Sequence, residues 1–187
     1  MVLGPLVVMR DGQPIADAAW RSRQDRRLLG ALISARGVPV PSERLIAWLW
    51  PDTAPDAAAI TLRSAVSSLR HTLEPERDAR ASARYILTRP GGYAWNMASD
   101  AWIDLEAFLA HLQAAYPPMP RSATDPNLES RSPDAEALGR AIALYRGDYL
   151  EDEPNAPWAV SLREMLRERF LAALTDLAEL QLAAGDY

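Results

Sequence analysis

The sequence predicts an α+β winged helix-turn-helix domain followed by an all-helical domain. In the first hundred residues, two pairs of short apolar segments, each pair joined by a glycine-containing turn, flank three segments of helical periodicity. The second half shows helical spacing only. Charge also divides the chain, since residues 1–98 carry 13 Arg against 9 acidic residues and residues 99–187 carry 7 against 16. We therefore expect a basic domain over residues 1–98 and an acidic one over residues 99–187.

The overall composition is that of an ordinary globular protein. The 187 residues are 49% hydrophobic and 24% charged. The absence of cysteine excludes disulfide scaffolds, cysteine-ligated metals and thiol nucleophiles. No apolar run approaches the roughly 18 residues of a membrane span, so we expect a cytoplasmic protein without membrane contact. The net charge of −5 argues against nucleic acid as a partner, but the basic first half reverses that argument for its own domain.

Both ends of the first domain are predicted to be hairpins. The apolar residues 2–10 predict a strand, which turns at Asp11-Gly12 into a second extended piece that reaches Ile15. Residues 85–88 and 93–97 predict two further strands around Pro90-Gly91-Gly92. A phosphate-binding loop is the weaker interpretation of these glycines, because no helix and no Lys-Ser/Thr pair follows them.

Two helices are predicted between the first hairpin and residue 51. Ser22 begins the first as its N-cap, with Asp25 at the capping-box position, and Gly37 ends it. The second covers residues 42–50 and stops at Pro51. We expect its two tryptophans, Trp48 and Trp50, to serve as core and domain-contact residues rather than as platforms for stacked bases.

The third predicted helix carries the candidate binding face. It begins near Pro55-Asp56, and its apolar residues follow spacings of 4, 3 and 4: Leu62, Val66, Leu69 and Leu73. A short helix, a turn and this longer helix form a helix-turn-helix, and the hairpin that follows is its wing. The remaining positions carry hydroxyls and cations without a carboxylate: Thr61, Arg63, Ser64, Ser67, Ser68, Arg70 and His71.

A helix face of this kind suits the major groove of DNA. Arg and hydroxyl side chains donate hydrogen bonds to phosphates and base edges, and no acidic group repels the DNA backbone. At the tip of the wing, Arg89 carries the charge that a narrow minor groove attracts. Taken singly, each of these side chains is more simply explained as a solvated surface residue. The combination favours DNA binding.

The second domain is predicted to consist of helices and one long loop. A helix covers residues 100–115, with Trp102, Leu105 and Phe108 on its apolar side. Five prolines then make residues 116–134 a loop or a partly disordered insert. Asp134 caps a helix that ends at Gly147. The last helix follows Pro157, and its inward-facing residues are expected to be Trp158, Leu162, Leu166, Phe170, Leu174 and Leu177. The acidic residues between these helices, 148–153, are expected to form a solvated loop.

Several short motifs resemble those of the SARP/AfsR-type bacterial transcriptional activators. The motifs in the first half are Leu3-Gly4-Pro5-Leu6, residues 45–51, residues 61–70 and Arg89-Pro90-Gly91-Gly92-Tyr93. Those in the second half are Asp104 with Phe108, Tyr145-Arg146-Gly147-Asp148, and Trp158 with Arg163. In that family an OmpR-type winged helix precedes a bacterial transcriptional activator domain (BTAD). The resemblance covers essentially the whole chain and implies that the second domain is tetratricopeptide-like.

The resemblance also implies roles for individual residues. Arg63, Ser64 and Ser68 would lie nearest the base edges, Thr61, Ser67 and Arg70 would face phosphates, and Arg89 would enter the minor groove. One position departs from the family pattern, which often has Arg where this chain has Ser68. Losing a bidentate base contact costs about 1–3 kcal/mol of discrimination. Either Arg63 compensates for it, or the protein is less selective and relies on repeated sites and on partners.

Two functional hypotheses follow. In the first, the protein is a transcriptional activator that binds promoter DNA, and the family implies direct repeats, paired subunits and contact with RNA polymerase holoenzyme. In the second, it is a protein-interaction adaptor whose winged helix no longer reads DNA. No cofactor and no metal is expected, and catalysis is disfavoured because His71 and His111 lie in different domains and no nucleophile or nucleotide motif is present. The chain ends at Gly185-Asp186-Tyr187, where the family pattern suggests a further helix, so we expect a longer protein.

Overall fold

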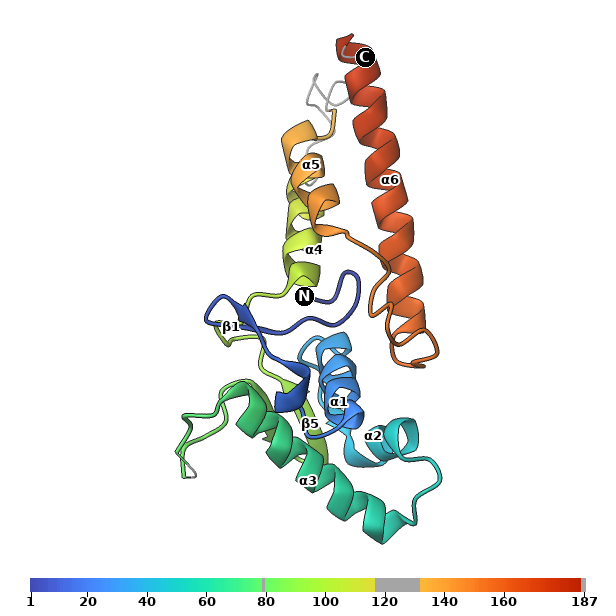
Figure 1. Cartoon of the computed structure of the whole chain (residues 1–187). Coiled ribbons are helices and arrows are strands. Elements are labelled where there is room, and N and C mark those ends of the chain that lie inside the picture. Colours follow the sequence, from blue (N-terminus) through green and yellow to red (C-terminus); the bar gives the residue numbers. More distant parts are fainter. Residues whose placement is uncertain (79, 117–131, 186–187) are drawn as a thin grey trace.

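The computed structural model describes residues 1–78, 80–116 and 132–185. These residues form two tiers (Figure 1). The lower tier holds α1 to α3 and a small sheet, and the upper tier holds α4 to α6. The fold is therefore a winged helix-turn-helix followed by an all-helical, tetratricopeptide-like domain, as predicted. Within the described residues, no helix is both long and apolar enough to cross a membrane.

Three helices build the core of the lower tier, and their bounds are α1 (Arg23–Ser34), α2 (Ser42–Leu49) and α3 (Pro55–Leu73). The predicted cap of α1 is confirmed, because the Ser22 side chain accepts a hydrogen bond from the Asp25 backbone N–H. Pro55 opens α3 at a position where its missing N–H costs nothing. The apolar faces of the helices meet, with Leu28, Leu32 and Leu69 completely buried between them.

A three-stranded antiparallel sheet completes the winged helix. Its order is β3-β5-β4, and its strands are β3 (Val40–Pro41), β5 (Gly92–Trp95) and β4 (Ile86–Arg89). The predicted wing hairpin is confirmed by the pairing of Arg89 with Gly92. Strand β3 was not predicted, and it passes so close to β5 that a Cβ at Gly92 would lie 2.1 Å from the Val40 carbonyl oxygen. Only glycine fits this position.

The first predicted hairpin exists but is short. Strands β1 (Met9–Arg10) and β2 (Gln13–Pro14) pair across Asp11-Gly12, both of which have positive φ. A 3₁₀ turn, η1 (Asp17–Ala19), follows. The prediction of one continuous strand over residues 2–10 is wrong. Leu3 and Gly4 instead form isolated bridges with Tyr149 of the upper tier, so this segment has its partner in the other half of the chain.

The upper tier consists of α4 (Asp104–Ala115), α5 (Ala135–Leu144) and α6 (Val160–Ala184). The Asp134 cap is confirmed, since its carboxylate accepts from the Glu136 and Ala137 backbone N–H groups. The first of these helices starts four residues later than predicted, and Trp102 lies outside it, 61% exposed. The inward placement of Leu174 is also wrong, because that side chain is 38% exposed. The predicted loop over residues 116–134 falls mostly outside the described residues.

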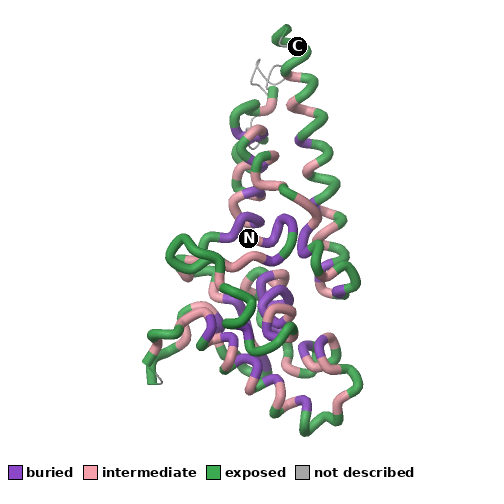
Figure 2. The backbone as a smooth tube through the Cα atoms, in the orientation of Figure 1, coloured by how far each residue is buried: buried purple, intermediate pink, exposed green. Residues whose placement is uncertain are grey.

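One hydrophobic cluster runs through both tiers (Figure 2). In the upper tier the rings of Tyr145 and Phe170 stack at 4.1 Å between centroids, and Phe108 packs against Tyr145 at 5.8 Å. Between the tiers, Trp48 on α2 packs on Trp158 at 5.5 Å, which confirms Trp48 as a domain-contact residue. The two tiers therefore share a core instead of touching only at their surfaces.

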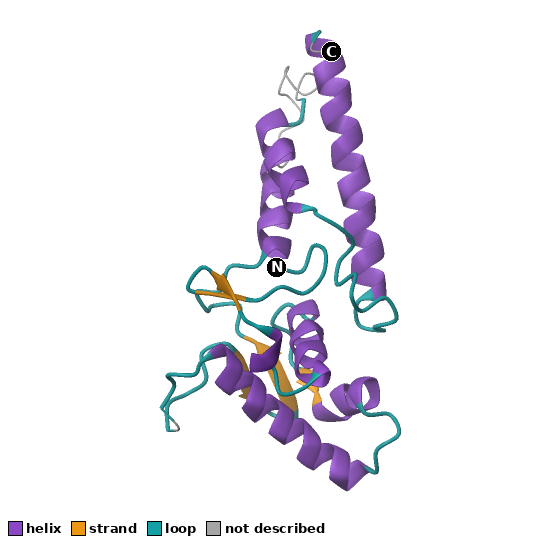
Figure 3. Ribbon diagram, viewed as in Figure 1, coloured by secondary structure: helices purple, strands orange, loops and turns teal. Residues whose placement is uncertain are grey.

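The N-terminal segment, residues 1–8, joins the tiers (Figure 3); we call it the strap. The carboxylate of Asp104, which is completely buried, accepts hydrogen bonds from the Val2 backbone N–H at 2.6 Å and the Leu3 backbone N–H at 3.0 Å. The same carboxylate pairs with Arg146 at 3.2 Å. The Gly4 N–H donates to the Asp148 carbonyl, and the Leu150 N–H donates to the Val2 carbonyl. The strap therefore both donates backbone hydrogen bonds to the upper tier and accepts them from it.

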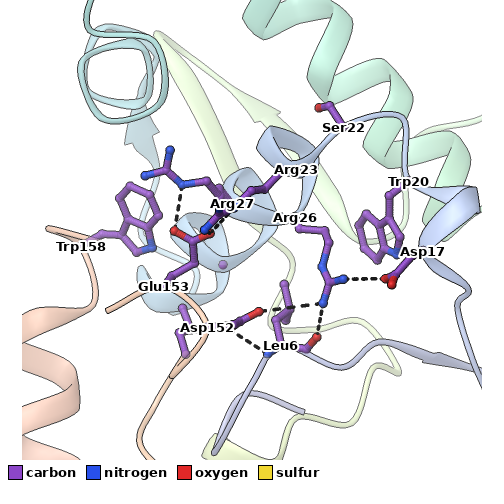
Figure 4. A pocket seen from close by; sticks show the side chains of 12 residues that line it. Leu6, Asp17, Trp20, Ser22, Arg23, Arg26, Arg27, Asp152, Glu153 and Trp158 are labelled. Carbon is purple, nitrogen blue, oxygen red and sulfur yellow. Dashed lines mark hydrogen bonds and ion pairs between the residues drawn. The ribbon is translucent and has the colours of Figure 1, made fainter. Parts of the chain in front are cut away.

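The acidic segment 148–153 is an interdomain contact, which corrects the prediction of a solvated loop (Figure 4). Glu153 pairs with both Arg23 and Arg27 at 3.0 Å, and Asp152 accepts from the Leu6 backbone N–H at 3.1 Å. The acidic residues of the upper tier thus form ion pairs with arginines at the start of α1 and accept a backbone hydrogen bond from the strap. Some of the acidic residues of the second half and some of the arginines of the first half therefore neutralise each other where the tiers meet.

Candidate nucleic-acid interface

Helix α3 lies along the lower edge of the lower tier, away from α4 to α6, and presents one side to solvent (Figure 1). Between residues 59 and 73 its exposed positions follow helical spacing, and they are Ile60, Arg63, Ser67 and His71. The opposite face is buried, and it includes Leu62, Val66 and Leu69. No carboxylate lies between residues 57 and 73, so the exposed ridge is neutral to cationic along that length.

Arg63 and Ser67 are exposed, as the spacing predicted. Ser64 lies beside them and is half-buried, and its hydroxyl oxygen accepts a hydrogen bond from the Arg21 guanidinium. Arg21 precedes the cap of α1, so two elements supply this edge of the surface. These three side chains of α3 lie together at the solvent-facing side of the helix.

Ser68 has a partner inside the protein. Its hydroxyl donates to the carboxylate of Asp25 at 2.7 Å, and the Ser22 hydroxyl donates to the other oxygen of the same carboxylate at 3.0 Å. Asp25 is 1% exposed, and a buried carboxylate needs such donors. The structure therefore uses the serine that replaces the family's arginine to anchor α3 on the first turn of α1.

Two other predicted site residues also bond within the fold. The guanidinium of Arg70 donates to the Ile86 carbonyl at 2.7 Å and to the Thr88 hydroxyl at 2.9 Å, which ties α3 to strand β4 of the wing. The Thr61 hydroxyl donates to the Ala57 carbonyl at 2.9 Å, one turn back along the same helix. The Thr61 hydroxyl and the Nε and Nη2 groups of Arg70 are therefore engaged in the free protein.

The wing carries Arg89 at its outer end. Arg89 is exposed at the last position of β4, and the turn that follows contains Pro90 and Gly91, whose φ of 75° suits glycine. Pairing of Arg89 with Gly92 holds the strand ends together. Arg89 therefore stands exposed at the end of a paired hairpin.

Two residues of this surface were missed by the sequence-based prediction. Ile60 is 61% exposed on the α3 ridge, although its aliphatic side chain suggested the core. Arg21 lies 43 positions before Ser64, so nothing in the local sequence links the two. Helical periodicity alone places Ile60 with Arg63 and Ser67, and that was the available signal for it.

Comparison with known proteins separates the chain into two matched regions. Residues 18–95 match the family described as "Transcriptional regulatory protein, C terminal", and residues 103–187 match the "Bacterial transcriptional activator domain". The strap and the first hairpin lie before both regions. The matched regions follow one another in the order that the resemblance implied.

The relatives are regulatory proteins. The chain is 31% identical over 184 residues to the regulatory protein AfsR of Streptomyces coelicolor, covering 98% of this chain and 17% of that protein. It is 29% identical over 185 residues to the transcriptional regulatory protein EmbR of Mycobacterium tuberculosis, covering 98% of this chain and 44% of that protein. The chain therefore spans less than half the length of these relatives. The names of both describe regulation, and that of EmbR describes transcriptional regulation.

A solved structure supports the same assignment. The chain matches that of Mycobacterium tuberculosis EmbR in complex with a low-affinity phosphopeptide with a TM-score of 0.74 and 27% identity. The match covers 99% of this chain and 45% of EmbR, so both tiers and their arrangement are included. The expected family is confirmed: the chain belongs to the SARP/AfsR-type transcriptional activators, in which an OmpR-type winged helix-turn-helix precedes a bacterial transcriptional activator domain.

Proposed function

We propose that this chain binds promoter DNA sequence-specifically, with α3 in the major groove and the wing against the adjacent minor groove. The observation that carries the proposal is the exposed ridge of α3, which presents Arg63 and Ser67 on a helix that has no carboxylate between residues 57 and 73. A helix of 19 residues with such a face fits the roughly 12 Å width of the major groove. Arg89 on the wing supplies the second contact.

The residues of the predicted site divide into two groups by their contacts in the free protein. Arg63, Ser64 and Ser67 are the candidates for base and phosphate contacts, and Arg89 is the candidate for the minor groove. Thr61, Ser68 and Arg70 bond within the fold, and we propose that they mainly position α3 and the wing.

The upper tier is proposed to contact protein partners. Residues 99–187 carry a formal balance of −9, which repels DNA and favours a protein surface. The partners that the family resemblance implies are a second copy of the chain on direct repeats and the RNA polymerase holoenzyme. The division into domains at residues 98 and 99 belongs to the same proposal, with the strap as an N-terminal segment held mainly by the second domain.

The test begins with selection of bound sequences from a randomised DNA pool, followed by titration of the selected site and a scrambled site at several salt concentrations. We expect affinity for both to fall steeply with salt, because neutralised phosphates release counterions. Arg63→Ala is expected to lower affinity for the selected site more than for the scrambled one, by roughly 5- to 150-fold for a bidentate base contact of about 1–3 kcal/mol.

Arg140→Ala is the matched control, since Arg140 is an exposed arginine on α5 whose one ion pair among the described residues is with Glu136, one turn away. It is expected to leave the discrimination between the two sites unchanged. If Arg63→Ala lowers the affinity for both sites equally, Arg63 contacts a phosphate and does not read a base. Failure to enrich any sequence, together with no binding at low salt, refutes DNA reading and favours the adaptor hypothesis.

A further inference from the structure

A hollow lies beside the first half of α3, between this helix, the end of α2 and the start of α1. Its volume is about 410 Å³. The residues that line it come from all three elements: Arg21, Ser22, Gln24, Asp25, Trp50, Ile60, Thr61, Ser64 and Ala65. The roles assigned above do not explain why Arg21, Trp50 and Ile60 gather on this flank.

Two polar side chains of the hollow, Arg21 and Ser64, keep hydrogen-bond donors that no group among the described residues accepts. Arg21 is exposed, and among the described residues its guanidinium has a hydrogen bond only to the Ser64 hydroxyl oxygen. That leaves further guanidinium N–H groups, together with the hydroxyl hydrogen of Ser64, which has no acceptor among the described residues. An arginine and a serine that offer donors side by side suit the oxygens of a phosphate.

The carboxylate in the hollow does not oppose an anion strongly. Asp25 is 1% exposed and its two oxygens accept from Ser22 and Ser68. It also occupies the first turn of α1, where the helix dipole offsets part of its charge. The outward-facing charge is therefore that of Arg21.

We propose that Arg21 and Ser64 bind one phosphate of the DNA backbone in this hollow, with Ile60 and Trp50 against the adjoining sugar. The inference rests on the proposed function, because the phosphate belongs to DNA whose groove holds α3. Arg21 then fixes the register of the helix from outside the groove, while Arg63 on the ridge reads bases. The contact is independent of base sequence.

The principal experiment compares wild type and Arg21→Ala on the selected and scrambled sites across salt. One phosphate contact contributes about 0.9 to the slope of log affinity against log salt, so an increase in salt of about fourfold costs wild type about 3.5-fold more affinity than the variant. The loss of affinity is expected to be equal on both sites. Arg21→Lys retains the charge and is expected to keep the wild-type slope, which makes it the rescue.

Arg23→Ala is the control, because Arg23 lies two residues away, its side chain is 76% exposed, it does not line the hollow, and it pairs with Glu153 of the segment 148–153 (Figure 4). Its slope should match that of wild type. An unchanged slope in Arg21→Ala overturns the phosphate site, as does an equal fall in Arg23→Ala. Since wild type binds DNA in both of these outcomes, they are distinct from failure of the proposed function.

A second measurement locates the phosphate. Methylphosphonate groups placed singly along the selected site remove one backbone charge at a time. At one position the substitution is expected to weaken wild type and to leave Arg21→Ala unaffected, because the partner of that phosphate is already missing. If every substitution weakens both proteins equally, Arg21 contacts no individual phosphate and the proposal is wrong.

Discussion

Tyr149 connects the upper tier with the strap through its backbone and with α1 through its side chain. It is completely buried, its backbone forms the bridges to Leu3 and Gly4 of the strap, and its hydroxyl lies 2.8 Å from the Ser34 hydroxyl on α1. Because Ser34 donates its hydrogen to the Gly30 carbonyl, Tyr149 is the donor of the pair. Burial raises the pKa of this phenol above its ordinary value of 10.0, so the fold requires the neutral form.

A pH titration of stability tests this arrangement. A phenol with a raised pKa contributes stability that is complete below the ordinary tyrosine pKa of 10.0 and is lost as pH rises above it. Burial likewise raises the pKa of Tyr145 to about 12, so both groups destabilise the fold in alkali. We expect Tyr149→Phe to cost about 1 kcal/mol at pH 8, for the lost hydrogen bond. The gap to wild type should narrow in urea denaturation above pH 10; a constant gap would contradict the assignment.

Arg70 and Arg63 lie on the same helix, and removing each of them is expected to change the free energy of unfolding by different amounts. Arg70→Ala removes the bonds to the Ile86 carbonyl and the Thr88 hydroxyl and is expected to lower the free energy of unfolding by about 1.5 kcal/mol. Arg63→Ala removes an exposed side chain and should stay within about 0.5 kcal/mol of wild type. Thermal unfolding of both variants checks this difference, and equal melting temperatures would show that Arg70 does not hold the wing.

Among the elements, strands β3 and β5 depend on a single glycine. Gly92→Ala places a Cβ against the Val40 carbonyl and is expected to cost about 3 kcal/mol, because neither backbone can move without breaking the pairing. Gly91→Ala is the comparison, since no atom lies within 4 Å of its added Cβ and only the positive φ is unfavourable. Its cost should be about 1 kcal/mol. Chemical denaturation that ranks Gly91→Ala as the worse variant would refute the close approach.

The elements also show what the sequence could predict. The three helices of the lower tier, the wing hairpin and the caps at Ser22 and Asp134 rest on local spacing and on capping chemistry, and all were predicted. Strand β3 has two residues, too few to show alternation. The exposed ridge of α3 followed from periodicity, but the partners of Ser68 and Ser64 lie 43 positions away and gave no local signal.

At the scale of the whole molecule, the buried carboxylate of Asp104 holds the strap against the upper tier. Asp104→Ala leaves the Val2 and Leu3 N–H groups and Arg146 without their acceptor and is expected to lower the free energy of unfolding by about 3 kcal/mol. Asp100→Ala removes an exposed carboxylate that pairs with Arg84 and should cost less than 1 kcal/mol. Urea denaturation of both variants measures the difference, and similar midpoints would show that the strap contributes little.

The tryptophan pair between the tiers gives the molecule a built-in optical reporter. The rings of Trp48 and Trp158 are 5.5 Å apart and inclined by 46°, close enough for their electronic transitions to couple. One ring belongs to the helix-turn-helix and the other to the upper tier, so the resulting circular dichroism signal depends on the angle between the two halves. Any event that tilts one half against the other therefore becomes visible without an added label.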